Sequence, residues 1–138
     1  MPCKPLDILS LAKTLGASQG GEAAERCAAS RAYYAALHEV DATFLDRPEF
    51  KRDGESSHGE IISRAVVYGK SIKPGRTDAA QIAQLMTRMR RSRNKADYAI
   101  EELFTTTEST ETLSRAELVL KLCQLVSSKL TMAGKKLA

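Results

Sequence analysis

Apolar residues recur at steps of three and four in every long segment of this chain, and no segment alternates apolar and polar residues. The first pattern places apolar side chains on one face of an α-helix, whereas a half-buried β-strand requires alternation. The sequence therefore predicts an all-α protein. Because 138 residues is the length of one ordinary domain, we expect a single helical domain over residues 1–138.

Glycine, proline and capping residues divide the chain into five predicted helices. Their expected ranges are Asp7 to Leu15, Glu22 to about Leu45, Ser57 to about Tyr68, about Asp78 to Phe104, and Ser114 to about Met132. Two capping boxes, Ser57 with Glu60 and Ser114 with Glu117, mark the beginnings of the third and fifth helices. The Thr-rich segment 105–110 is expected to be a loop. Short connections predict a five-helix antiparallel bundle with two long central helices, the second and the fourth.

Composition and motifs exclude several classes of protein. The formal net charge of +4 permits a nucleic-acid partner without requiring one. Because no run of about 18 apolar residues is present, we expect no membrane span and no membrane partner. Asp7 and Lys13 interrupt the one segment that resembles a signal peptide, so we expect a cytoplasmic protein. The three cysteines form no CxxC pair and no phosphate loop or HExxH motif occurs, so neither a metal site nor a cofactor is expected.

Two charged residues interrupt the apolar face of the fourth predicted helix. At about 100° per residue, Arg93 lies near the centre of this face and Asp97 lies one turn later at its edge. A guanidinium inside a helical bundle requires a carboxylate partner or a wet cleft. We therefore expect Asp97 to pair with Arg93, and its neutralisation to cost about 3 to 5 kcal/mol. The apolar face itself consists of Ile82, Leu85, Met86, Met89, Ala96, Ile100, Leu103 and Phe104.

The second predicted helix carries a similar combination of residues. Small side chains form one of its faces, and four polar residues lie on the same face: Arg31, Tyr34, His38 and Asp41. We predict that Arg31 joins Arg93 and Asp97 in a shared polar cluster, with Asp41 as a further candidate member. Two interpretations of this cluster are open, because it either fixes the register of the helices or lines a cleft that binds a ligand. His58, at the beginning of the third helix, is an exposed first-turn residue or part of an anion site.

Three segments carry a resemblance to a known family. They are SRAYYAALHEVDATFL, SSHGEII and RMRRSRNKADYAIEELF, with these matching residues: Arg31, Tyr33, Tyr34 and Ala35, then His58, then Arg93, Ala96, Asp97 and Tyr98. In this order the segments resemble the HEPN domain superfamily, in particular its small stand-alone prokaryotic members. The likeness covers roughly residues 20 to 130, which is nearly the whole chain.

The resemblance implies an all-helical homodimer of a toxin–antitoxin or phage-defence system, often encoded beside a small nucleotidyltransferase. Many members are metal-independent ribonucleases that use an arginine, a polar residue such as asparagine and a later histidine. Arg93 and Asn94 match this motif, whereas Tyr98 occupies the position of the histidine. The candidate catalytic residues are therefore Arg93, Asn94, Tyr98 and His58. The candidate binding residues are Arg31, Tyr34, Asp97 and Arg90.

Two functions are compatible with these residues. The first is binding of RNA or a nucleotide in a polar groove, with metal-independent RNA cleavage as its catalytic form. The second is a non-catalytic interaction module that binds a nucleotidyltransferase partner. Tyrosine, with an ordinary pKa of about 10, is a poor base at neutral pH, so only His58 can replace the missing histidine. On an ideal helix Tyr98 also points roughly 140° away from Arg93, so their convergence requires a bend or a second subunit.

Overall fold

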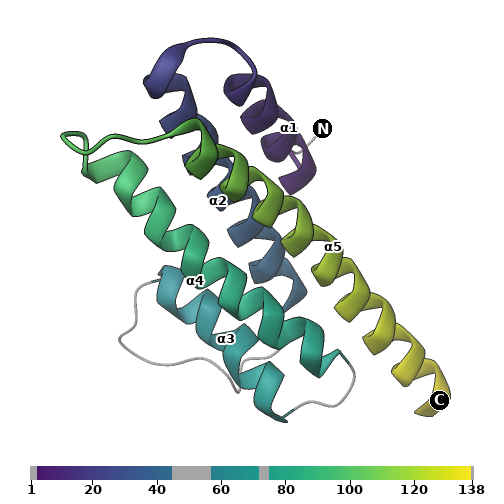
Figure 1. Cartoon of the computed structure of the whole chain (residues 1–138). Coiled ribbons are helices and arrows are strands. Elements are labelled where there is room, and N and C mark those ends of the chain that lie inside the picture. The colour runs from purple at the N-terminus through teal and green to yellow at the C-terminus, as the bar shows by residue number, and fades with distance from the viewer. Residues whose placement is uncertain (1–2, 45–56, 72–74, 138) are drawn as a thin grey trace.

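The computed structural model describes residues 3–44, 57–71 and 75–137. It contains five helices, namely α1 (Pro5–Gly16), α2 (Gly21–Thr43), α3 (Ser57–Ser71), α4 (Arg76–Tyr98) and α5 (Thr106–Leu137). None of the described residues belongs to a β-strand, so the all-α prediction is confirmed for this part of the chain. Figure 1 shows the helices packed along one another, with the long helix α5 running beside α2 and α4.

The helices do not all alternate in direction. The pairs α1–α2, α3–α4 and α4–α5 are antiparallel, as the prediction of an antiparallel bundle requires (Figure 1). In contrast, α3 runs parallel to α2. The beginning of α3 lies beside Tyr33, and Arg64 of α3 lies beside Asp41, about two turns further along α2. Short loops force neighbouring helices to be antiparallel, whereas the interval 44–56 is long enough to allow the other direction.

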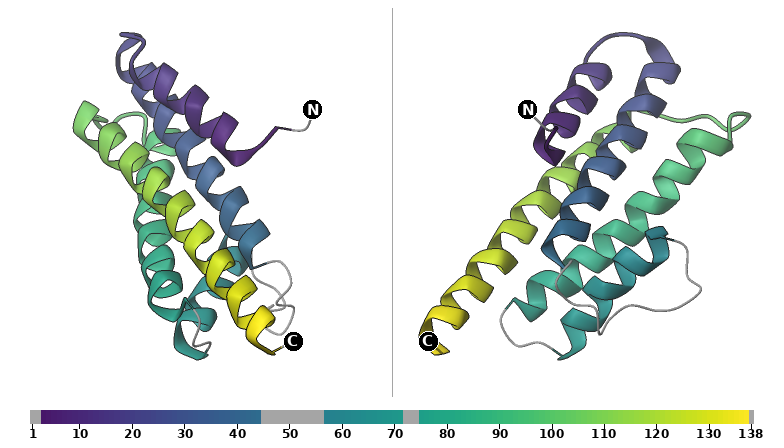
Figure 2. Two further views of the ribbon diagram at one scale, coloured as in Figure 1. Left: turned by 90° about the vertical axis from the view of Figure 1, so that its right-hand side faces the viewer. Right: turned by 180° about the vertical axis from the view of Figure 1, so that it is seen from behind.

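The core lies between α2, α4 and α5, with α1 and α3 packed on different sides of α2 (Figures 1 and 2). The long alanine-rich helix α2 buries a face that differs from the small-residue face on which Arg31 and His38 were placed. Both of those residues are exposed. The buried residues of α2 are Ala28, Ala29, Ser30, Ala32, Tyr33, Ala35, Ala36, Leu37 and Val40. With alanine on several faces, the periodicity alone did not determine which face turns inward.

The turn between α4 and α5 differs from the prediction. Helix α4 ends at Tyr98 rather than at Phe104, which leaves Ile100 and Leu103 exposed. Helix α5 begins at Thr106, eight residues before the predicted start, so most of the Thr-rich segment is helical. Its capping box is formed by Thr105 and Glu108, in which Glu108 N–H donates to Thr105 Oγ1 at 3.1 Å and Thr105 N–H donates to Glu108 Oε2 at 2.7 Å.

The remaining helix boundaries lie close to their predicted positions. Helix α2 ends at Thr43, near the predicted Leu45, and α3 begins at Ser57 as its sequence indicated. The side chain of Ser57 lies outside the described residues, so the predicted capping box there is not seen. Over the ranges that the structure describes, no helix is long and apolar enough to cross a membrane.

Candidate functional site

Arg93 lies at the meeting point of α2 and α4. Its position in the apolar face of α4 carries the guanidinium toward α2, and its side chain is 13% exposed. The Nη2 atom donates to the hydroxyl of Tyr34 at 2.6 Å, and Nη1 donates to Oδ1 of Asn94 at 3.2 Å. The guanidinium is therefore oriented by partners from two helices and retains some access to solvent.

Asp97 is the carboxylate that balances Arg93. Its Oδ2 atom lies 2.8 Å from Nε of Arg93, one helical turn away, although the Nε–H does not have the direction of a hydrogen bond. The hydroxyl of Ser30, on α2, donates to the same oxygen at 3.2 Å. The structure thus contains the ion pair expected from the spacing of these two residues. Its third member is Ser30 rather than the predicted Arg31.

Arg31 instead takes part in a row of alternating arginine and tyrosine side chains. The carbon at the centre of its guanidinium lies 4.9 Å from the centroid of the Tyr34 ring. The corresponding carbon of Arg93 lies 5.2 Å from the Tyr34 ring and 5.3 Å from the Tyr98 ring. These distances are typical of cation–π contacts. We call the row of Arg31, Tyr34, Arg93 and Tyr98 the arginine–tyrosine ladder.

Tyr98 forms the open end of this ladder. Its side chain is 70% exposed, and α4 ends at this residue. The ideal-helix geometry predicted that Tyr98 and Arg93 converge only through a bend or a second subunit. The long arginine side chain brings them together within one chain. The ladder therefore presents an aromatic ring to solvent directly beside a guanidinium.

His58 lies next to the ladder, at the beginning of α3. Its Nδ1 atom is 3.0 Å from the hydroxyl of Tyr33, and its ring lies edge-on to that of Tyr34 with centroids 5.7 Å apart. Burial, followed by the charges of Arg93 and Arg90, lowers the pKa of His58 below its ordinary value of 6.5. Burial likewise raises the pKa of Tyr33. Both shifts favour the uncharged forms of His58 and Tyr33.

Asp41 and His38 were placed near the same cluster by their helical face, but the structure separates them from it. Asp41 accepts a hydrogen bond of 2.9 Å from Arg64, which also pairs with Glu60 at 3.2 Å. This buried arginine joins α3 to α2. His38 is exposed. The predicted residues that the structure brings together are therefore Arg31, Tyr34, His58, Arg93, Asn94, Asp97 and Tyr98, with Arg90 acting on His58 through its charge.

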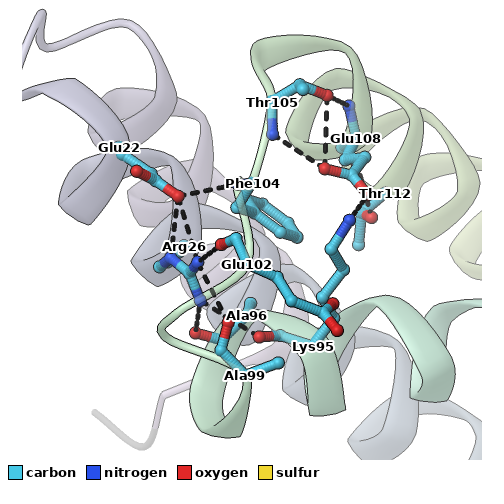
Figure 3. Close-up of polar contacts among 10 residues, drawn as sticks. All are labelled: Glu22, Arg26, Lys95, Ala96, Ala99, Glu102, Phe104, Thr105, Glu108 and Thr112. Carbon is cyan, nitrogen blue, oxygen red and sulfur yellow. Dashed lines mark hydrogen bonds and ion pairs between the residues drawn. The ribbon is translucent and has the colours of Figure 1, made fainter.

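Arg26 has a structural role that was not predicted from the sequence. From α2 its guanidinium reaches the end of α4, where Nη1 donates to the carbonyl oxygens of Lys95 at 3.0 Å and Ala96 at 2.9 Å (Figure 3). Nη2 donates to the carbonyl oxygens of Ala99 at 3.2 Å and of Glu102. One side chain thus donates to four carbonyl groups at a helix end, where backbone carbonyl groups lack intrahelical donors, and those of Lys95 and Ala99 also accept a backbone N–H. In the sequence near Arg26, the one indication of a structural role is Glu22, which lies one turn earlier on the same helix and pairs with it.

Two carboxylates complete this α4–α5 turn. Glu22 accepts a hydrogen bond of 2.7 Å from the backbone N–H of Phe104, and this contact, followed by Arg26, lowers the pKa of Glu22 (Figure 3). Glu108 pairs with Lys95 at 2.5 Å, and Lys95, followed by the backbone N–H of Thr105, lowers the pKa of Glu108. The end of α4, where Tyr98 lies, is therefore fixed by contacts between α2, α4 and α5.

These two lowered pKa values predict acid sensitivity. A carboxyl group whose pKa is lower in the folded state contributes stability above its ordinary value of 4.5 and loses it as the pH falls through the folded value. Between about pH 5 and pH 3, the free energy of unfolding should fall more steeply for the wild type than for a Glu22→Gln, Glu108→Gln double variant. Urea melts across this range measure both slopes. Equal slopes would contradict the prediction.

Comparisons with known proteins give no match for this chain, whether with family models, with curated proteins or with solved structures. The described residues also contain no group of three or more histidine, cysteine, aspartate and glutamate side chains that could hold a metal ion.

Proposed function

We propose that this chain is a HEPN-like protein that binds single-stranded RNA at the arginine–tyrosine ladder. On the resemblance of its three motifs we further infer a homodimer in a toxin–antitoxin or defence system. The observation that carries the proposal is the exposed ring of Tyr98, held 5.3 Å from the guanidinium of Arg93. An aromatic ring next to an arginine offers a stacking surface for a base and a cation for its phosphate.

The charges of the side chains around the ladder also favour a ligand with phosphate groups. Arg31 and Arg93 belong to it, and the charge of Arg90 reaches the adjacent His58. Among the residues that the structure describes, Asp97 is the one carboxylate bound to the arginines of the ladder, and it is already occupied by Arg93 and Ser30. The site is therefore net positive, as contact with a phosphate backbone requires.

Tyr98→Ala should weaken RNA binding by about 1 to 3 kcal/mol, the range for removing one base-stacking ring. Tyr98→Phe, which keeps the ring, should bind almost as well as the wild type. Ile100→Ala is the matched control, because it truncates an equally exposed apolar side chain two residues away. Fluorescence anisotropy with a labelled hexauridylate measures all four proteins. Absence of binding by the wild type, or equal losses in Tyr98→Ala and Ile100→Ala, would refute the proposal.

The position of His58 favours metal-independent RNA cleavage as a second candidate function. A neutral imidazole beside Arg93 can take the proton of a 2′-hydroxyl while the guanidinium stabilises the attacked phosphate. This role requires the tautomer in which Nδ1–H donates to the oxygen of Tyr33, because Nε2 then remains free to accept the proton. The 2′-oxygen bonds to phosphorus, the bond between phosphorus and the 5′-oxygen breaks, and the leaving 5′-oxygen takes a proton from water. The products would carry a 2′,3′-cyclic phosphate and a 5′-hydroxyl.

Incubation of cellular RNA with the protein in excess EDTA tests this second function. Wild-type protein should produce cyclic-phosphate ends, and His58→Ala should abolish them while it retains RNA binding. Intact RNA after incubation with the wild type would exclude cleavage. In that case a stable complex with a nucleotidyltransferase would support the alternative role as a non-catalytic interaction module.

A further inference from the structure

Asn94 follows Arg93 on α4, and Tyr98 lies one turn after Asn94 on the same helix. Residues four apart on a helix are neighbours on its surface. A tyrosine side chain on a helix leans toward the preceding turn, as the contact of the Tyr98 ring with Arg93 also shows. Asn94 and Tyr98 are both exposed. A base stacked on the Tyr98 ring would therefore have the amide of Asn94 beside it.

The chemistry of Arg93 fixes the orientation of the Asn94 amide. The Nη1 atom of Arg93 donates to Oδ1 of Asn94 at 3.2 Å. A guanidinium group carries donors only, so it can face the oxygen of an amide but not its amino group. The opposite orientation would set two donors against each other. The amide oxygen is therefore turned toward Arg93, and the amino group is the end of the amide that is left for a ligand.

Arg93 is itself positioned by its other contacts. Its Nη2 atom donates to the hydroxyl of Tyr34 at 2.6 Å, and its Nε atom lies 2.8 Å from the carboxylate of Asp97. The same guanidinium lies over one face of the Tyr98 ring, so a base would stack on the opposite face. The site thus offers a base one aromatic face and, next to it, one oriented amide donor.

We propose that Asn94 determines which base the site accepts, and that it selects bases with a keto group, namely uracil and guanine. An asparagine with both ends of its amide free matches adenine, whose edge places an acceptor beside an amino group. At Asn94 the amino end alone faces a ligand, so the base must supply an acceptor. Uracil O4 and guanine O6 are acceptors, whereas cytosine and adenine carry amino groups at the same positions. This inference rests on the proposed RNA-binding function and adds a base preference to it.

Replacing Asn94 with aspartate tests this preference, because a carboxylate has nearly the shape of the amide but only accepts hydrogen bonds. The ligands are 2′-O-methyl hexauridylate and 2′-O-methyl hexacytidylate, neither of which can be cleaved through a 2′-hydroxyl. In fluorescence anisotropy the wild type should bind the uridylate about fivefold more tightly than the cytidylate. Asn94→Asp should prefer the cytidylate, whose amino group donates to a carboxylate, although the added negative charge weakens binding of both RNAs. Asn94→Ala should bind the two RNAs equally.

Gln81→Glu is the matched control, since it makes the same change from amide to carboxylate at an exposed position on α4, about 20 Å along the helix axis from Asn94. Its preference should equal that of the wild type, because a distant charge acts on both RNAs alike and is screened by salt.

The outcomes separate this inference from the function on which it rests. If the wild type binds neither RNA, the proposed function fails and the base preference fails with it. If the wild type binds both RNAs equally, or Asn94→Ala keeps the preference for the uridylate, the role assigned to Asn94 alone is wrong. A loss in Asn94→Asp by the same factor for both RNAs would also overturn that role, because it would show that Asn94 contacts the phosphate instead of the base.

Discussion

Replacing Arg26 with methionine is expected to lower the free energy of unfolding by about 3 kcal/mol, although the substitution keeps most of the aliphatic volume. The side chain is 12% exposed and donates to four carbonyl oxygens at the end of α4 and in the turn that follows. Methionine removes all four of these donors, and among the described contacts only the carbonyl oxygens of Lys95 and Ala99 keep a backbone N–H donor. Urea melts of the variant and the wild type measure the difference.

Two further variants separate this capping role from the ion pair with Glu22. Arg115 pairs with Glu111 at the same spacing on α5, at 3.6 Å, and the two side chains are 26% and 54% exposed, so Arg115→Met should cost less than about 0.5 kcal/mol. Arg26→Lys keeps the charge but offers donors from one nitrogen, and we expect an intermediate loss. A similar loss in Arg26→Met and Arg115→Met would show that the contacts with the carbonyl groups do not stabilise the fold.

Asp97→Asn is expected to lower the free energy of unfolding by about 2 kcal/mol, because it leaves the guanidinium of Arg93 without its carboxylate. The sequence alone suggested a loss of about 3 to 5 kcal/mol, the value for a fully buried pair. The structure reduces it, since Asp97 is 28% exposed and water can partly replace its contacts. Tyr98→Phe should cost less than about 0.5 kcal/mol, because the Tyr98 side chain is mostly exposed.

The same Asp97 variant should change RNA affinity in the opposite direction. Without its carboxylate, Arg93 is free to contact a phosphate, so the hexauridylate should bind more tightly to the less stable protein. Anisotropy and urea melts on one preparation give both values. Equal unfolding midpoints for Asp97→Asn and Tyr98→Phe would show that the ion pair does not stabilise the fold. Unchanged or weaker RNA binding by Asp97→Asn would show that Arg93 does not contact the phosphate.

The sequence by itself determined the features that depend on the geometry of a single helix. The three- and four-residue steps of Ile82, Met86 and Met89 identified the buried face of α4 before any packing was known. The spacing of Arg93 and Asp97 likewise indicated an ion pair, because residues four apart on a helix are neighbours whatever surrounds them. The sequence contains the capping-box pattern twice before the last helix, at Thr105 with Glu108 and at Ser114 with Glu117. The prediction chose the second, whereas the helix begins after the first.

Only the tertiary structure decided which side chains meet across helices and where α4 ends. Ser30 rather than Arg31 reaches Asp97, because the rotation of α2 about its axis depends on how its alanine faces pack. Helix α4 ends at Tyr98 although Ile100 continues its apolar pattern, since Arg26, about 70 positions earlier in the chain, binds the carbonyl groups there. The spacing of apolar residues reflects the geometry of a single helix. These contacts depend instead on the relative rotation and register of helices that are distant in sequence.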